Sequence, residues 1–196
     1  MGKKLHVLRS FSRFLVALVL LCPASVVSTN SQGFAIDLAG KPFDPFQAAR
    51  GKVVVLIFVR TDCPISNRYA PTIQQLSTNR IDQTTFFLVY PGRKETMCAI
   101  RRHGKDFGYT LAAIRDPQHV LVKQSAVQTT PEAAVFNAKR QLVYHGRIDN
   151  LYEDFGHARK SATTHELADA VEAAIAGKTL SGSATPAVGC YISDLE

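Results

Sequence analysis

The chain has 196 residues, of which 46% are hydrophobic, so it is long enough to fold around one core. Its formal net charge is +7, but four of the basic residues lie within the first 13 positions. Without residues 1–28, 19 basic and 16 acidic residues remain, which is a net charge of +3. This small excess does not support binding to nucleic acid.

The N-terminal segment has the pattern of a secretory signal peptide. A basic start is followed by an apolar run over residues 14–21 and by small residues over 24–28. The apolar run is too short to cross a bilayer, so we expect no stable membrane span. Lipidation of Cys22 is a weaker alternative, because Leu21 stands where a small residue is expected. We therefore predict a signal peptide over residues 1–28 and a periplasmic or secreted protein.

Predicted strands and helices alternate along the rest of the chain. The strands are expected over residues 34–38, 53–59, 84–90, 111–114, 133–136 and 142–145, the last two forming a hairpin. The helices are expected after Cys63, over 94–107, over 117–125 with Asp116 as cap, and from Thr163 or Thr164 to about Gly177. This order predicts an α/β domain, residues 29–178, with a mixed central sheet, followed by a tail, residues 179–196.

Cys63 follows the longest apolar run, residues 53–59, and stands where a helix begins. Backbone N–H groups and the helix dipole at that position favour the thiolate over the thiol. Asp62 opposes ionisation, whereas Arg60 and a hydrogen bond from the Ser66 hydroxyl favour it. An inert buried cysteine is the alternative, and it belongs in the middle of an apolar run. We predict that Cys63 is a nucleophile.

This stretch resembles the active site of the thioredoxin-like superfamily. Members carry Cys-x-x-Cys after a buried strand, then an Ala-Pro that kinks the helix eight residues after the first cysteine. Ala70-Pro71 has this spacing from Cys63, but Ser66 replaces the second cysteine. The lead-in around Gly51-Lys52 looks like the redoxin branch, which comprises exported thiol oxidoreductases and peroxiredoxin relatives. The resemblance implies a three-layer α/β sandwich that acts on protein thiols or disulfides and needs no cofactor. It does not identify the external reductant.

Two further segments carry the resemblance. Thioredoxin-like proteins place a cis-proline, often after threonine, opposite the active cysteine, where it offers backbone groups to a substrate chain. Thr130 and Pro131 are therefore expected to bind substrate, with an ordinary loop proline as the alternative. A Gly-Arg-Ile-Asp stretch like that of some redoxins contains Arg147. Arg147 is expected either to stabilise an anion near Cys63 or to pair with Asp149.

Export would place the chain where disulfides persist. Three cysteines remain beyond residue 28: Cys63, Cys98 and Cys190. Cys190 lies in a small apolar island within a polar tail, so we predict that the tail docks, with Gly189 permitting close backbone approach. Cys190 would then resolve the intermediate formed by Cys63; a permanent disulfide and an unpartnered thiol are the alternatives. Cys98 is interpreted as a half-buried bystander.

The sequence thus predicts an exported thiol–disulfide oxidoreductase in which Cys63 attacks and Cys190 resolves. A peroxiredoxin-like peroxidase with peroxide as substrate is the near alternative, but the Pro-x-x-x-Thr-x-x-Cys motif fails at Leu56 and Arg60. The histidines show no metal-ligand spacing, so no metal site is predicted. An alternative of another class is a copper-carrying chaperone. Its soft metal site would be assembled from Cys63, Cys190 and either His145 or His157.

Overall fold

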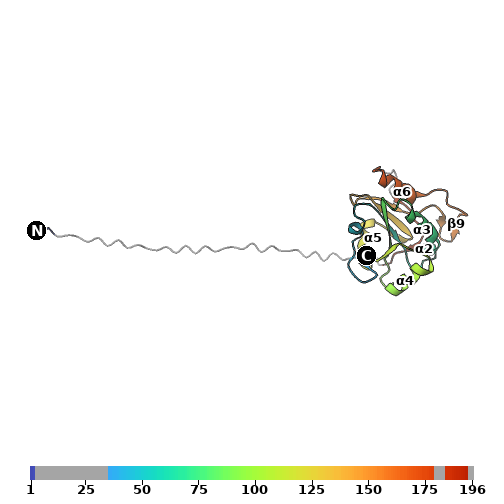
Figure 1. Ribbon diagram of the computed structural model, residues 1–196. Coiled ribbons are helices and arrows are strands. Elements are labelled where there is room, and N and C mark those ends of the chain that lie inside the picture. Colours follow the sequence, from blue (N-terminus) through green and yellow to red (C-terminus); the bar gives the residue numbers. More distant parts are fainter. Residues whose placement is uncertain (3–34, 179–183, 194–196) are drawn as a thin grey trace. The chain divides into compact units, whose positions relative to one another are not determined.

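The computed structural model describes residues 1–2, 35–178 and 184–193 (Figure 1). The predicted signal peptide lies outside the described residues, apart from its first two positions. Within the described ranges, no helix combines the length and apolar character needed to cross a membrane. The fold is therefore that of residues 35–178 together with the tail segment 184–193.

A mixed sheet of seven strands organises these residues, in the order β1-β4-β3-β2-β6-β7-β10. The strands are β1 (Ile36–Asp37), β2 (Val53–Phe58), β3 (Thr84–Tyr90), β4 (Ala112–Arg115), β6 (Glu132–Phe136), β7 (Leu142–Gly146) and β10 (Ala184–Thr185). β2 runs parallel to β3 and antiparallel to β6, and β6 is antiparallel to β7. The predicted mixed sheet and its hairpin are confirmed.

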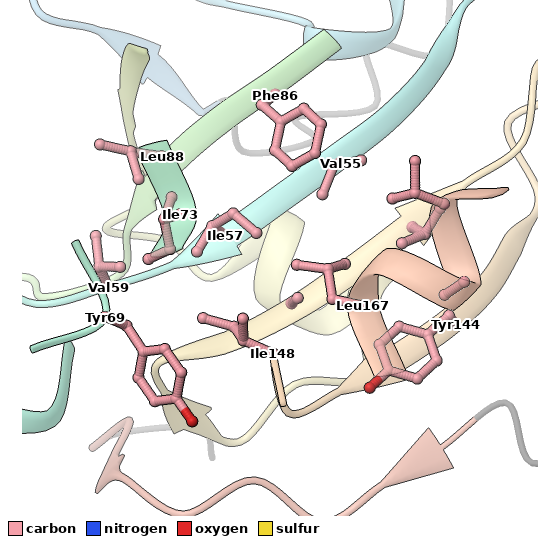
Figure 2. Packing of buried hydrophobic residues seen from close by; sticks show 14 of the residues in the cluster. Val55, Ile57, Val59, Tyr69, Ile73, Phe86, Leu88, Tyr144, Ile148 and Leu167 are labelled. Atoms are coloured by element: carbon pink, nitrogen blue, oxygen red, sulfur yellow. The ribbon is translucent and has the colours of Figure 1, made fainter. Parts of the chain in front are cut away.

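The side chains of β2 alternate between two hydrophobic clusters, one on each face of the sheet. Val55 and Ile57 lie on the same side as Ile73 of α3 (Ala70–Thr78) and Leu167 of α6 (Glu166–Ile175) (Figure 2). The second cluster contains Val54, Leu56 and Phe58 with residues of α1 (Pro45–Ala48) and α5 (Val120–Ser125). All six residues of β2 are buried, as expected for a strand covered on both faces. The predicted three-layer architecture is confirmed.

Two predicted helices begin later than the sequence pattern indicates. Helix α4 (Met97–Asp106) starts behind the N-cap Thr96, whose hydroxyl accepts a hydrogen bond from the Ala99 N–H. Helix α5 starts at Val120, three residues after the predicted position. Asp116 still satisfies its first turn, because its carboxylate accepts from the N–H groups of Val120 (2.8 Å) and Val122 (2.9 Å). Thr96 was not among the predicted caps, and the N-cap residue of α5 is His119 although Asp116 accepts from its first turn.

The predicted start of the last helix is wrong. Helix α6 begins at Glu166, and neither Thr163 nor Thr164 is its N-cap. Both threonines are instead held by Asn150, whose side-chain oxygen accepts from their backbone N–H groups at 2.7 and 3.1 Å. The N-cap residue of α6 is His165, which follows these two threonines. The sequence reading also missed α1 and the short hairpin β8 (Tyr152–Asp154) and β9 (His157–Ala158).

The tail docks on the body, as predicted. β10 extends the central sheet parallel to β7, and β11 (Cys190–Tyr191) pairs antiparallel with β5 (Thr129–Thr130). Ile192 is buried in the second cluster, whereas Val188 and Cys190 pack against the first. The tail therefore contacts the hydrophobic clusters of both faces.

Candidate active site

Cys63 stands at the junction between strand β2 and helix α2 (Pro64–Arg68). It is the N-cap residue of α2, with an extended backbone, and Pro64 occupies the first helical position. Proline suits that position, because its missing N–H would have no partner there. The Cys63 sulfur accepts a hydrogen bond from the backbone N–H of Ser66 at 3.5 Å. The predicted position of Cys63 at a helix start is confirmed, and its sulfur receives a donor that favours the thiolate.

The turn before Cys63 is held by a half-buried carboxylate. Glu95, in the loop before α4, accepts hydrogen bonds from the backbone N–H groups of Thr61 (2.7 Å) and Gly92 (3.2 Å). Burial raises the pKa of Glu95, although these hydrogen bonds oppose the shift. In the same turn, Arg60 forms an ion pair with Asp62 at 2.8 Å. Arg60 therefore offsets the negative charge that Asp62 brings near the thiol.

The Thr130–Pro131 peptide bond is cis, as predicted. The Cys63 thiol donates a hydrogen bond to the carbonyl oxygen of Thr130 at 3.0 Å. Only the thiol form can donate this bond, so the contact opposes ionisation of Cys63. The predicted proximity of the Thr130-Pro131 segment to the cysteine is confirmed.

Strand β5 is braced by Glu132, a nearly buried residue that sequence reasoning missed. One carboxylate oxygen accepts from the backbone N–H groups of Gln128 (2.9 Å) and Thr129 (3.1 Å). The other oxygen lies 3.3 Å from Nδ1 of His145. The available signal was a charged residue at the start of an otherwise apolar strand, where a buried carboxylate needs partners.

The tail strand covers this segment. Its register sets Cys190 opposite Thr130, and the Ile192 N–H donates to the carbonyl oxygen of Gln128 at 2.9 Å. A Cβ atom at residue 189 would overlap the Thr130 carbonyl oxygen and lie 2.7 Å from the carbonyl carbon. Only glycine fits against β5 at that point. The predicted close approach at Gly189 is confirmed.

Cys190 packs against the hydrophobic cluster that contains Cys63, and both cysteines are free thiols. Burial raises the pKa of Cys63, but hydrogen bonds from the Cys190 thiol and from Ser66 outweigh it, so that the pKa falls below its ordinary value. Burial, the donation to Cys63 and the charge on Cys63 raise the pKa of Cys190 to about 12. Cys63 is therefore the more acidic thiol of the pair, and Cys190 keeps its proton when Cys63 ionises.

Ser66 occupies the position of the missing second cysteine and is fully buried. Its hydroxyl makes no hydrogen bond of good geometry with any described residue, yet it contributes to the lowered pKa of Cys63. These two observations are compatible, because a hydroxyl can rotate toward a thiolate that accepts a bond. The Ser66 backbone N–H is the fixed donor at this position, because the helix sets its direction.

A chain of hydrogen bonds that sequence reasoning missed connects α2 to α4 and β3. The Asn67 side chain donates to the Thr61 carbonyl at 3.4 Å and accepts from His103 Nε2 at 2.8 Å. The Tyr90 hydroxyl lies 2.9 Å from His103 Nδ1 and donates to it. Burial lowers the pKa of His103, which keeps the ring neutral, as this donor pattern requires. His103 follows Ile100 by three residues, and that helical spacing was the available signal.

Arg147 forms an ion pair with Glu166 and not with the predicted Asp149. Its guanidinium pairs with Glu166 of α6, and its backbone N–H donates to the Thr185 carbonyl at 3.3 Å. The expected pair with Asp149 is wrong, because that carboxylate accepts from the Tyr69 hydroxyl at 2.6 Å. An anion-binding role for Arg147 at the active cysteine receives no support from these contacts.

The other residues considered from the sequence, Cys98, His145 and His157, do not lie with Cys63 and Cys190. Cys98 is exposed on α4 and is not the half-buried residue expected. Within residues 35–178 and 184–193, no three His, Cys, Asp or Glu side chains are grouped so that they could hold a metal ion. His145 contacts Glu132, and His157 is exposed on β9. The histidines that a copper carrier requires therefore do not join Cys63 and Cys190.

Comparison with known protein families gives no match, and neither does comparison with curated protein sequences. Solved structures do match. A hypothetical protein SMc02350 from Sinorhizobium meliloti 1021 has a TM-score of 0.68 at 21% identity, over 82% of this chain and 89% of that chain. An uncharacterized conserved protein from Geobacillus kaustophilus has a TM-score of 0.68 at 17% identity, over 81% and 87%. A secreted Mycobacterium tuberculosis disulfide oxidoreductase homologous to E. coli DsbE has a TM-score of 0.50 at 20% identity, over 74% and 96%.

At these sequence identities the likeness establishes the fold alone. The reaction has to be inferred from the residues of the site. The chain has a thioredoxin-like α/β sandwich with a mixed central sheet. Within it, Cys63 follows the central strand β2, and Pro131 precedes its antiparallel neighbour β6.

Proposed function

We propose that the protein is an exported thiol–disulfide oxidoreductase whose redox centre is the Cys63–Cys190 pair. The observation that carries the proposal is the register that sets Cys190 opposite Thr130, whose carbonyl oxygen accepts from the Cys63 thiol, so that the tail supplies a second thiol where Ser66 offers none. The fold is shared with a secreted disulfide oxidoreductase, which agrees with the proposal. The predicted signal peptide is the argument for export.

In the proposed reaction, the Cys63 thiolate attacks one sulfur of a partner disulfide. A mixed disulfide forms, the partner bond breaks, and the departing partner thiolate takes a proton. Cys63 then no longer carries the charge that raises the pKa of Cys190. Cys190 therefore loses its proton more easily and attacks the Cys63 sulfur, releasing the second partner thiolate. The partner disulfide becomes two thiols, and the protein dithiol becomes one disulfide.

The neighbouring residues take supporting roles in this proposal. The Ser66 N–H, helped by the hydroxyl, stabilises the thiolate of Cys63 before it attacks. Thr130 and Pro131 form the wall beside the sulfurs and offer main-chain groups to a substrate chain. Peroxidase chemistry is not favoured, because Leu56 lies in the buried strand β2 and Arg60 is paired with Asp62.

Reaction of the reduced protein with glutathione disulfide tests the proposal. In a Cys98→Ser background, which removes the exposed thiol, the parent protein should become an internal disulfide and release two glutathione molecules per chain. The Cys190→Ala variant should stop with one glutathione on Cys63, as read by intact mass. If Cys63→Ala reduces glutathione disulfide as fast as its parent, the proposal is lost.

Export is tested separately. We expect the protein recovered from outside the cytoplasm of a bacterial host to begin near residue 29, as read by N-terminal sequencing. Retention of the uncleaved chain in the cytoplasm would remove export from the proposal and leave the redox pair untouched.

A further inference from the structure

The tail occupies the edge of β5 that an incoming polypeptide would use. Among the described strands, β11 is the one paired with β5. The Thr130 hydroxyl donates to the Cys190 carbonyl at 3.3 Å, and the Ile192 N–H donates to the Gln128 carbonyl at 2.9 Å. Arg60 adds a bond to the Tyr191 carbonyl at 3.4 Å. On the tail side these bonds involve only backbone N–H and C=O groups, so any extended segment in the same register can form them.

The side chains of the tail show what this edge accepts at each position. Residue 189 has no room for a Cβ, because Thr130 lies against it. The next residue, Cys190, packs against the hydrophobic cluster that contains the fully buried Cys63. Tyr191 is 77% exposed, whereas Ile192 is 5% exposed and packs into the second hydrophobic cluster. The edge therefore restricts the side chain at residues 189, 190 and 192 and leaves residue 191 unrestricted.

We propose that the tail is an internal substitute for the substrate, which is an extended polypeptide segment reading glycine, cysteine, any residue, large aliphatic residue. The segment would lie in the register of residues 189–192, with its disulfide sulfur at the place of the Cys190 sulfur. This identification of the substrate rests on the proposed function, whereas the docking of such a segment does not. Substrate and tail use the same edge, so they exclude one another.

The proposal orders the reaction. The tail leaves β5, the segment binds, and the Cys63 thiolate breaks the substrate disulfide to form a mixed disulfide, while the departing thiolate takes a proton. The substrate segment then leaves the β5 edge while its cysteine stays linked to Cys63, and the tail returns to that edge. The Cys190 thiolate attacks the Cys63 sulfur and expels the substrate thiolate, which takes a proton. A tethered strand has an effective concentration of about millimolar, so a micromolar peptide cannot displace it from the intact protein.

The test uses the full chain in a Cys98→Ser background, with the tail loosened in two ways. Gly189→Ala introduces the Cβ that overlaps Thr130, and Ile192→Asp removes the buried anchor. Gly104→Ala is the matched control, because its Cβ would meet no atom within 4 Å. The probe is a fluorescent peptide of residues 187–193 carrying Cys190→Ser, and binding is followed by anisotropy.

We expect the peptide to bind both loosened variants at least about tenfold more tightly than the parent or the Gly104→Ala control. A second peptide with alanine at the glycine position should bind none of them. Alkylation of Cys63 by iodoacetamide should accelerate in both loosened variants and slow again when the first peptide is added. Each of these results supports the tail as a substitute for the substrate.

Equal peptide affinity for parent and loosened variants overturns the proposal, as does failure to bind variants whose Cys63 has become reactive. Unchanged alkylation in both loosened variants also overturns it, because the tail would then not be the cover. The proposed function fails independently, if the parent protein never forms the Cys63–Cys190 disulfide. Peptide binding without that disulfide would retain the docking site and discard the redox role.

Discussion

The two cysteines of the pair are held by opposite means. Cys63 ends a turn between a fully buried strand and a helix, and its sulfur receives a backbone N–H from the first turn of that helix. Cys190 belongs to a two-residue strand that depends on one glycine and on the burial of Ile192. Correspondingly, the pKa of Cys63 is lowered, and that of Cys190 is raised to about 12.

The difference teaches which part of the site can move. Displacing Cys63 disturbs β2, whose residues belong to both hydrophobic clusters. Displacing Cys190 costs a short strand pairing and the burial of one aliphatic side chain, which is worth about 1.5–3 kcal/mol. A contact of that size opens without unfolding the body. The fixed thiol is the one suited to attack, and the movable thiol is the one suited to resolve.

The largest effect is expected from Cys63→Ser, which removes the fixed thiol. We predict that disulfide exchange falls by on the order of a hundredfold or more, because a hydroxyl does not replace a thiolate as nucleophile. Cys98→Ser should leave the rate unchanged, since Cys98 is exposed and lies outside the pair. Release of glutathione from glutathione disulfide measures both.

The next effect concerns the donor that Cys190 provides. Cys190→Ala should raise the pKa of Cys63, because the thiolate loses the hydrogen bond that lowers it. The thiolate fraction at neutral pH then falls, and the pH at which Cys63 becomes reactive moves upward. Cys190→Ser should retain part of the shift, since its hydroxyl also donates. Ultraviolet titration of the thiolate in a Cys98→Ser background distinguishes the two variants, and identical curves would contradict the role of the donor.

A smaller effect is expected at Glu132, which braces the strand beneath the tail. Glu132→Gln keeps the size of the side chain but removes the negative charge from the oxygen that accepts from the Gln128 and Thr129 N–H groups. We predict a loss of about 1–2 kcal/mol in the free energy of unfolding, measured in urea, and faster alkylation of Cys63. Glu172→Gln is the control, because it breaks an exposed ion pair with Arg80 worth about 0–1 kcal/mol. Equal effects of the two substitutions would show that Glu132 does not hold the tail site.

The smallest effect is expected from Ser66→Ala. The backbone N–H at that position remains, and only a hydroxyl without good bonding geometry is lost. The pKa of Cys63 should rise less than in Cys190→Ala, and the exchange rate should fall by less than about fivefold, which corresponds to about 1 kcal/mol. A larger shift than that of Cys190→Ala would reverse the ranking of the two donors.

The parts of the site that sequence reasoning predicts are those encoded by neighbouring residues. An apolar run followed by a cysteine and a helix pattern is local, so the position of Cys63 follows from it. The docking of the tail was predicted from an apolar island in a polar segment, and Gly189 from the need for close approach. Both predictions depend on composition within a few positions.

The residues that sequence reasoning missed act over long distances along the chain. Glu95 holds a turn 34 residues earlier, and His103 acts on Asn67 36 residues earlier. Neither partner can be inferred from spacing, because the fold alone brings them together. Arg147 illustrates the same limit, since Glu166 and not the nearby Asp149 is its partner. Local charge patterns describe what is adjacent in sequence and not what is adjacent in space.

The central claim is that a fixed thiol and a tail thiol form one redox centre. It is tested most directly by oxidising the purified protein and mapping its peptides by mass spectrometry without reduction. We predict one cross-link, between Cys63 and Cys190 of the same chain, with Cys98 left as a free thiol. A Cys63 that stays reduced, or that links to Cys98 or to a second chain, would contradict the claim.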